Sequence, residues 1–179
     1  MGMSMSWIAV ETGDPDAVCG EIGLVRTGDQ GGFMDFPTGG ATTPSGWYVV
    51  LFDDPGTAHD CGEALARISE KGQAVRCAFI ESTMFSLVEG WAGGKMAWSV
   101  THDRGEGLYA LDVRGDPPGD FAAIRDEHTA LQDAEGGASA GVDYIFDVPL
   151  ELAKKITGYR VEDFEGDDPR QTYEGLEPL

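Results

Sequence analysis

The chain has 179 residues, 41% of them hydrophobic, which is enough to form a globular domain with a buried core. Asp and Glu outnumber Lys and Arg by 32 to 12, so the formal net charge at pH 7 is −20. A field of this sign repels nucleic-acid backbones and anionic membrane surfaces, and we expect neither as a partner.

The acidity has three explanations that the sequence leaves open. It could serve recognition of a basic protein partner, adaptation to a high-salt cytoplasm, or solubility without a specific partner. Nothing in the sequence predicts the oligomeric state.

The cysteine content favours a cytoplasmic location. Cys19, Cys61 and Cys77 form no CxxC pair and leave an odd thiol, which suits a reducing compartment. The longest apolar run, residues 48–52, is far too short to cross a bilayer. The three thiols are most simply explained as core residues.

The first half of the chain predicts two similar units, each a strand followed by a helix. Residues 7–10 form the first strand, and the Asp14-Pro15 pair is typical of a helix start. Residues 47–52 form the second strand, and apolar residues at helical spacing follow from 57 to 72. Each unit also contains Trp, Asp-Pro and Cys-Gly-Glu, which indicates either a duplicated unit or a coincidence of short motifs. Between the units, the glycine-rich residues 28–45 predict a long loop.

Residues 74–114 show the alternation of aromatic and β-branched residues that is typical of antiparallel strands. The Gly93-Gly94 pair predicts a two-residue hairpin turn, which places Phe85 opposite His102 and puts Glu89 on the same face. We expect helices to cover the apolar side chains of that face, namely Phe85, Leu87, Trp98, Val100, Tyr109 and Leu111.

The last third predicts a helix over 120–131, a strand over 142–146 and a helix over 149–157. The acidic residues 161–179, rich in Gly and Pro, predict a C-terminal tail.

The predicted fold is therefore a single α+β domain over residues 1–160. Its antiparallel sheet is built mainly from residues 74–114, with the strands at Trp7 and Trp47 added and helices at its sides.

His102 and the adjacent Asp103 are the strongest candidates for catalysis or metal binding. A His at the end of a strand, beside an acidic loop, is a frequent place for acid–base or metal chemistry. With Glu81 they could ligate a divalent metal, although no cofactor motif occurs in the sequence. The alternative is that Asp103 only begins a turn and His102 is an ordinary residue at the sheet edge.

Glu89 is a third candidate, because burial on an apolar face would raise the pKa of its carboxyl and allow it to act as a general acid. The alternative is a salt bridge. If a pocket exists, we expect His102 and a residue of 28–45 to border it, with Phe85 or Tyr109 as an apolar wall.

Three segments resemble a family of uncharacterised bacterial proteins. They are Met84-Phe85-Ser86 with Glu89-Gly90-Trp91, the run from Trp98 to Asp103, and residues 145–160. No activity is known for that family, so the resemblance implies a bacterial origin and transfers no catalytic residue.

These observations favour a non-enzymatic binding or protein-interaction protein, because no complete catalytic motif accompanies the acidic surface. The alternative is a small metal- or acid–base-dependent enzyme that uses His102 and Asp103, together with Glu81 or Glu89.

Overall fold

The computed structural model describes residues 2–11, 14–164 and 172–179. Its helices and strands, in chain order, are β1 (Ser4–Glu11), α1 (Pro15–Glu21), β2 (Leu24–Gly31), β3 (Thr38–Thr42), β4 (Trp47–Phe52), α2 (Thr57–Asp60), α3 (Gly62–Ser69), β5 (Gln73–Ile80), β6 (Phe85–Ala92), β7 (Lys95–Asp103), β8 (Leu111–Gly115), α4 (Asp120–Ala134), α5 (Asp147–Thr157) and β9 (Tyr173–Pro178). Short 3-10 turns connect several of them. No helix of these residues is long and apolar enough to cross a membrane.

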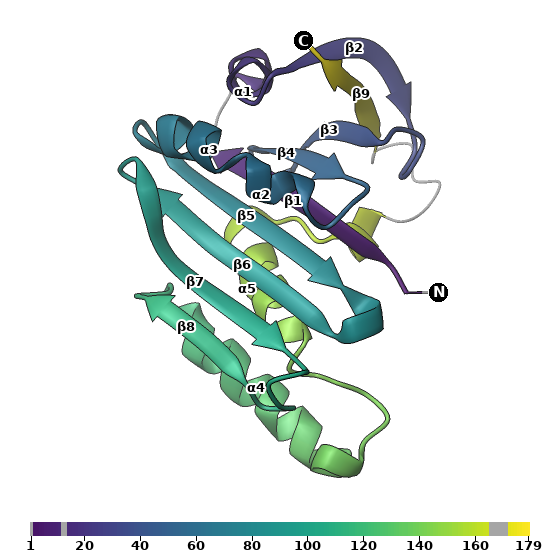
Figure 1. The fold of residues 1–179 in the computed structure, drawn as a ribbon, viewed down its shortest axis with the longest axis vertical. Helices are drawn as coiled ribbons and strands as arrows, with labels where there is room; N and C mark the ends of the chain where they lie inside the picture. Colours follow the sequence, from purple (N-terminus) through teal and green to yellow (C-terminus); the bar gives the residue numbers. More distant parts are fainter. Residues whose placement is uncertain (1, 12–13, 165–171) are drawn as a thin grey trace.

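The fold is α+β, as predicted, with a larger sheet than the sequence indicates. All the described strands form one antiparallel sheet in the order β2-β9-β3-β4-β1-β5-β6-β7-β8 (Figure 1). The alternating residues 74–114 supply β5 to β8, which lie side by side at one end. The strands at Trp7 and Trp47 are β1 and β4, and both pair within the same sheet.

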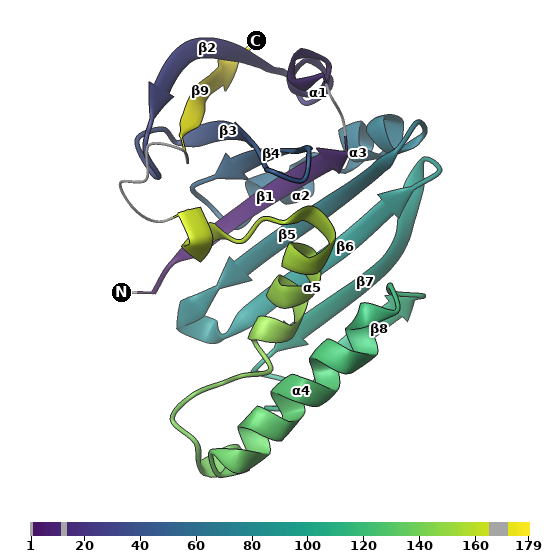
Figure 2. The ribbon, with the colours of Figure 1, turned by 180° about the vertical axis from the view of Figure 1, so that it is seen from behind.

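Helices cover both faces of the sheet. Figure 2 shows α5 lying across β5, β6 and β7, with α4 beside it; we call this the α5 face. The larger apolar core lies there, where Trp7 meets Tyr159 edge to face with ring centroids 5.1 Å apart. Helices α1, α2 and α3 cover part of the opposite face, the α3 face, around Ile8 and Leu65. Ile8 and its neighbour Ala9 in β1 point to opposite faces and neither has exposed surface, so the centre of the sheet is buried on both sides.

The prediction of a long loop over residues 28–45 is wrong. β2 takes up the start of this range and β3 lies near its end. One of the glycines that indicated a loop is needed for close packing, because a Cβ on Gly40 would lie 2.1 Å from the hydroxyl oxygen of Tyr48. A glycine in a buried strand allows such an approach, and sequence alone does not distinguish it from a turn glycine.

The prediction of a tail over 161–179 is also wrong for the part that the structure describes. β9 pairs with β2 on one side and β3 on the other, inside the sheet. Tyr173 is 2% exposed, and its hydroxyl lies 2.9 Å from that of Tyr159. The fold therefore extends past residue 160; residues 165–171 lie outside the described part of the chain.

The predicted strand over 142–146 is a turn that leads into α5. Ile145 and Phe146 are buried because they pack at the start of this helix, and their apolar character resembled a strand. The predicted helices over 120–131 and 149–157 are confirmed as α4 and α5. The side chain of Asp14 accepts a hydrogen bond from the amide of Ala17, as expected at the start of α1.

Both strand–helix successions of the first half are present, as β1 with α1 and β4 with α2 and α3. The shared Cys-Gly-Glu motif does not occupy the same place in the two. Cys19 lies inside α1, whereas Cys61 lies between α2 and α3.

The Gly93-Gly94 hairpin turn is confirmed, since Ala92 pairs with Lys95 and both glycines have positive φ. The predicted register fails beyond the second pair, because β7 contains an extra residue, Ala97, that has no partner in β6. Such a β-bulge moves every later pair by one position and reverses the face of the side chains.

The bulge separates the predicted site residues. His102 pairs with Ser86 instead of Phe85, and Glu89 pairs with Ser99. His102 therefore lies on the α5 face and Glu89 on the α3 face, so the prediction that they share a face is wrong.

The expected set of covered side chains is divided in the same way. Trp98, Val100 and Leu111 belong to the core of the α5 face. Phe85 and Leu87 alternate with the residues of that face and lie on the α3 face, where they are half-buried. Tyr109 precedes β8 and is 44% exposed.

Candidate functional site

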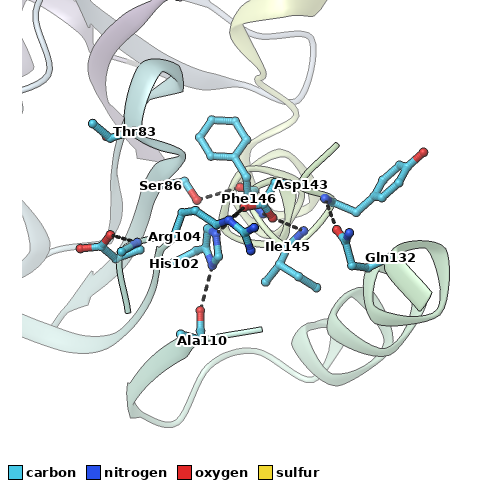
Figure 3. Close-up of polar contacts among 12 residues, drawn as sticks. Thr83, Ser86, His102, Arg104, Ala110, Gln132, Asp143, Ile145 and Phe146 are labelled. Carbon is cyan, nitrogen blue, oxygen red and sulfur yellow. Dashed lines mark hydrogen bonds and ion pairs between the residues drawn. The ribbon is translucent and has the colours of Figure 1, made fainter. Parts of the chain in front are cut away.

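His102 lies near the end of β7 and has no exposed surface. Its Nδ1 is 2.8 Å from the carbonyl oxygen of Ala110, and its Nε2 is 3.1 Å from Oδ2 of Asp143 (Figure 3). A carbonyl oxygen only accepts, so Nδ1 carries a proton and donates it. Both ring nitrogens are thus used inside the protein, and neither is free to take a proton from a substrate in this arrangement.

Asp143 joins the histidine to the start of α5. Its Oδ1 accepts hydrogen bonds from the amides of Ile145, at 3.1 Å, and Phe146, at 3.2 Å. The side chain of Ser86 in β6 donates to the carbonyl oxygen of Phe146 at 2.7 Å. On the solvent side, Nε of Arg104 lies 3.9 Å from Oδ2 of Asp143. These contacts fasten the beginning of α5 to β6 and β7 (Figure 3).

Gln132 holds the chain segment that carries Asp143. This buried side chain donates to the carbonyl oxygens of Gly137 and Val142, and it accepts from the amide of Tyr144 at 2.8 Å. The sequence analysis missed both Asp143 and Gln132. A usable signal for Asp143 was its position shortly before the start of a helix. An Asp there commonly accepts hydrogen bonds from the backbone amides two and three residues later.

Asp103 does not join His102. The two are consecutive in β7, so their side chains point to opposite faces. Oδ1 of Asp103 accepts a hydrogen bond from the amide of Gly105 at 2.8 Å. This bond stabilises the turn after β7, which is the alternative role that the sequence indicates.

Glu89 is buried and forms the salt bridge that was its alternative interpretation. Its Oε1 lies 2.6 Å from Nη2 of Arg76, and its Oε2 accepts from the indole nitrogen of Trp91 at 3.1 Å. Arg76 also donates to the carbonyl oxygen of His59 in α2, at 3.1 Å. The pair thus connects α2 to β5 and β6 beneath the helices of the α3 face. With Oε1 on Arg76 and Oε2 on Trp91, the carboxylate is engaged inside the protein, which does not suit a general acid that has to reach a substrate.

The structure does not gather Glu81, His102 and Asp103 into a metal site. Oε2 of Glu81 accepts from the amide of Met3 at 2.7 Å. Across residues 2–11, 14–164 and 172–179, no group of three or more His, Cys, Asp or Glu side chains is arranged to hold a metal ion.

The predicted pocket between His102 and residues 28–45 is not formed. Residues of this range belong to β2 and β3, which are separated from β7 in the sheet by β4, β1, β5 and β6. The phenol of Tyr109, the proposed apolar wall, donates to Oδ1 of Asp133 in α4 at 2.5 Å.

The three cysteines have the character of core residues. Burial raises the pKa of each thiol above its ordinary value, most strongly for the fully buried Cys77. Thiols of this kind stay protonated at neutral pH and are poor nucleophiles.

The described arginines are all paired with carboxylates. Every arginine in the described part of the chain lies within 4 Å of an Asp or Glu oxygen, namely Arg26, Arg67, Arg76, Arg104, Arg114, Arg125 and Arg160. Arg160 alone contacts Asp147, Glu151 and Glu162. Since acidic residues are in large excess, most remaining carboxylates of the described residues are exposed and have no ion pair with Lys or Arg there, and they define the electrostatic surface.

Comparisons with known proteins give no match: neither a family model nor a curated protein nor a solved structure matches the chain. The resemblance to uncharacterised bacterial proteins therefore stays a prediction. The description of the site rests on its residues alone.

Proposed function

We propose that the protein is a binding protein without catalytic activity of its own, and that its partner is a basic protein. The observation that carries this proposal is the surface charge. At −20, and with its described arginines already paired, the chain presents carboxylates that a cationic partner would neutralise.

The geometry of the candidate residues supports a non-catalytic role. His102 and Glu89 carry the richest chemistry of the chain, and each is enclosed and bonded to another buried residue. A catalytic acid or base has to reach a substrate, directly or through one water molecule. Neither residue does so in this arrangement.

A calorimetric titration tests the binding proposal. The probe is a lysine-rich peptide of about 18 residues, and the matched control is a glutamate-rich peptide of the same length, both at about 0.15 M salt, where weak surface attraction is largely screened. We expect saturable one-to-one binding of the lysine-rich peptide alone. The absence of saturable binding would remove the proposal.

Metal analysis tests the alternative enzyme. The protein as purified is measured for zinc, manganese and iron, and the measurement is repeated after incubation with each metal and dialysis. We expect less than a stoichiometric amount in each case. Stoichiometric metal that is lost in a His102→Ala or Asp103→Asn variant would instead support the metal-dependent enzyme.

A further inference from the structure

One part of the sheet has no helical cover. On the α3 face, α2 packs on β1 and β5, and α3 packs toward the Gly93-Gly94 end of β6 and β7. In Figure 1 no helix lies in front of the other end of β6, β7 and β8, toward the loop after β7. We call this region the open face and define it by Ile80, Phe85, Leu87 and Thr101.

The open face is an apolar strip across neighbouring strands. Ile80 of β5 pairs with Phe85 of β6, and in the next row Leu87 pairs with Thr101 of β7. All four side chains lie on the α3 face and are half-buried, whereas Ala74, Arg76 and Glu89, on the same face nearer to α2 and α3, are buried. Their remaining exposure therefore comes from the missing helix.

Carboxylates border the strip. A hollow of about 490 Å³ at the β7–β8 end is lined by Thr101, Asp103, Glu106, Ala110, Leu111 and Asp112. The nearby cations are already engaged: Arg114 pairs with Asp112 at 3.0 Å, and Arg104 faces Asp143 on the other side of the sheet. Asp103 and Glu106 are thus left without a cationic neighbour among the described contacts.

We propose that the open face binds an amphipathic, basic helix of the partner protein, an inference that rests on the function proposed above. The apolar side of that helix packs on Phe85 and Leu87, and its Lys or Arg side chains reach Asp103 and Glu106. Three neighbouring strands span roughly 10 Å from first to last. This width matches the diameter of one helix, about 10 Å, and helices α1, α2 and α3 already pack on other parts of the same face.

Charge indicates which kind of segment binds the open face. A second copy of this chain would bring another −20 to the same surface, and the two acidic rims would repel each other. An acidic segment meets the same repulsion. A basic segment instead gains electrostatic attraction at the rim while it covers the apolar strip.

The test compares two defined peptides by fluorescence anisotropy at about 0.15 M salt. One is an 18-residue peptide of Leu and Lys at helical spacing, and the other has the same composition in an order that gives no apolar face. We expect the amphipathic peptide to bind about tenfold tighter or more. Two variants of the open face, Leu87→Gln and Glu106→Lys, should each weaken its binding by about the same factor.

Matched controls lie at the C-terminal end of α4, which packs on the opposite face: Leu131 is in its last turn and Glu135 directly follows it. Leu131→Gln removes an apolar side chain that is 42% exposed, and Glu135→Lys reverses an exposed charge. Both should leave the affinity within about twofold of the wild type. Glu106 lies in an exposed loop, so its variant keeps the proposal testable even if Leu87→Gln does not fold.

Three results would overturn the inference. If the controls weaken binding as much as the open-face variants, the helix binds elsewhere, and only the general function survives. If neither peptide binds, the inference and the proposed function fail together. If sedimentation detects a dimer that Leu87→Gln abolishes, the occupant is a second copy.

Discussion

His102 and Glu89 are polar side chains at buried positions. Each is stable there because it pairs with a residue from a different element. His102 in β7 meets Asp143 from the turn before α5. Glu89 in β6 meets Arg76 from β5, which in turn reaches a carbonyl oxygen of α2. Removing one member of such a pair leaves the other buried without a partner, which costs more than the pair itself contributes.

His102→Ala should therefore destabilise the protein by about 3 kcal/mol, in contrast to the expectation for a half-exposed residue at a strand end. The loss has two causes: a cavity where the ring lay, and a buried Asp143 carboxylate without its partner. Urea unfolding followed by circular dichroism measures it. His59→Ala, at an exposed position in α2, is the control and should change stability by less than about 0.5 kcal/mol. Equal stability of the two variants would show that the pair does not fasten α5.

We expect Asp54 to stabilise the folded protein to an extent that depends on pH. It accepts from the hydroxyl of Thr57 and from the amides of Gly56, at 2.7 Å, and Thr57, at 2.9 Å. The Thr57 hydroxyl, aided by these amides, holds the pKa of Asp54 below its ordinary value. A lowered pKa in the folded state means that the stabilisation is present above the ordinary aspartate pKa of about 3.9. It is lost as the pH falls through the lowered value.

We expect Asp54→Asn to reduce the free energy of unfolding at pH 7 by about 1 kcal/mol, a modest value because solvent screens this partly exposed site. The difference from the wild type should shrink as the pH falls below the ordinary aspartate pKa of about 3.9 and through the lowered value of the folded state. The measurement is urea unfolding at a series of pH values. Asp53→Asn, at the exposed neighbouring position, serves as the control and should show no such trend. A difference that stays constant down to acid pH would contradict the assignment.

At the level of elements, the sequence predicts the helices and strands that depend on local pattern. It does not predict those that form only by pairing with distant segments of the chain. β5 to β8 and the helices α4 and α5 follow from periodicity and turn residues close in the chain. β9 does not, because its run Tyr-Glu-Gly-Leu-Glu-Pro contains Gly, Pro and acidic residues, and it becomes a strand by pairing with β2 and β3. The Ala97 bulge is equally invisible, and it alone moved His102 and Glu89 to opposite faces.

Gly90 pairs with Trp98 next to this bulge. The indole of Trp98 lies over Gly90, where a Cβ would be 2.2 Å from it. We expect Gly90→Ala to destabilise the protein by about 2 kcal/mol, because the indole or the strand has to move within a packed core. Gly20→Ala is the matched control, since Gly20 lies in α1 and a Cβ added there would meet no atom within 4 Å. There, alanine should be neutral or stabilise by up to about 1 kcal/mol.

Thermal unfolding followed by tryptophan fluorescence distinguishes the two glycine variants. A shift of Tm by roughly 3 °C corresponds to 1 kcal/mol in a chain of this length. If Gly90→Ala were as stable as the wild type, the close packing of the Trp98 indole on Gly90 would be contradicted.

For the whole molecule, the charge is the property that the fold leaves unexplained. The described arginines all form ion pairs, and the net charge of the chain is still −20. The carboxylates in excess therefore repel one another across the molecule. Partner binding, salt adaptation and solubility all produce such a field. They differ in what relieves the repulsion, because a partner neutralises one surface whereas dissolved salt screens all of them.

Thermal unfolding in potassium chloride separates these explanations. If the acidity serves a partner, Tm should rise as salt is raised from about 0.01 to 0.3 M, because the Debye length falls from about 30 Å to below 10 Å and self-repulsion is screened. It should then level off, since screening also weakens surface ion pairs such as Arg26 with Glu174. A Tm that keeps rising into molar potassium chloride would favour adaptation to a high-salt cytoplasm instead.

Chloride is preferred to sulfate here, because sulfate stabilises folded proteins generally by exclusion from their surface. The lysine-rich peptide supplies the control at 0.3 M salt: when repulsion is already screened, only a specific complex raises Tm further, by mass action.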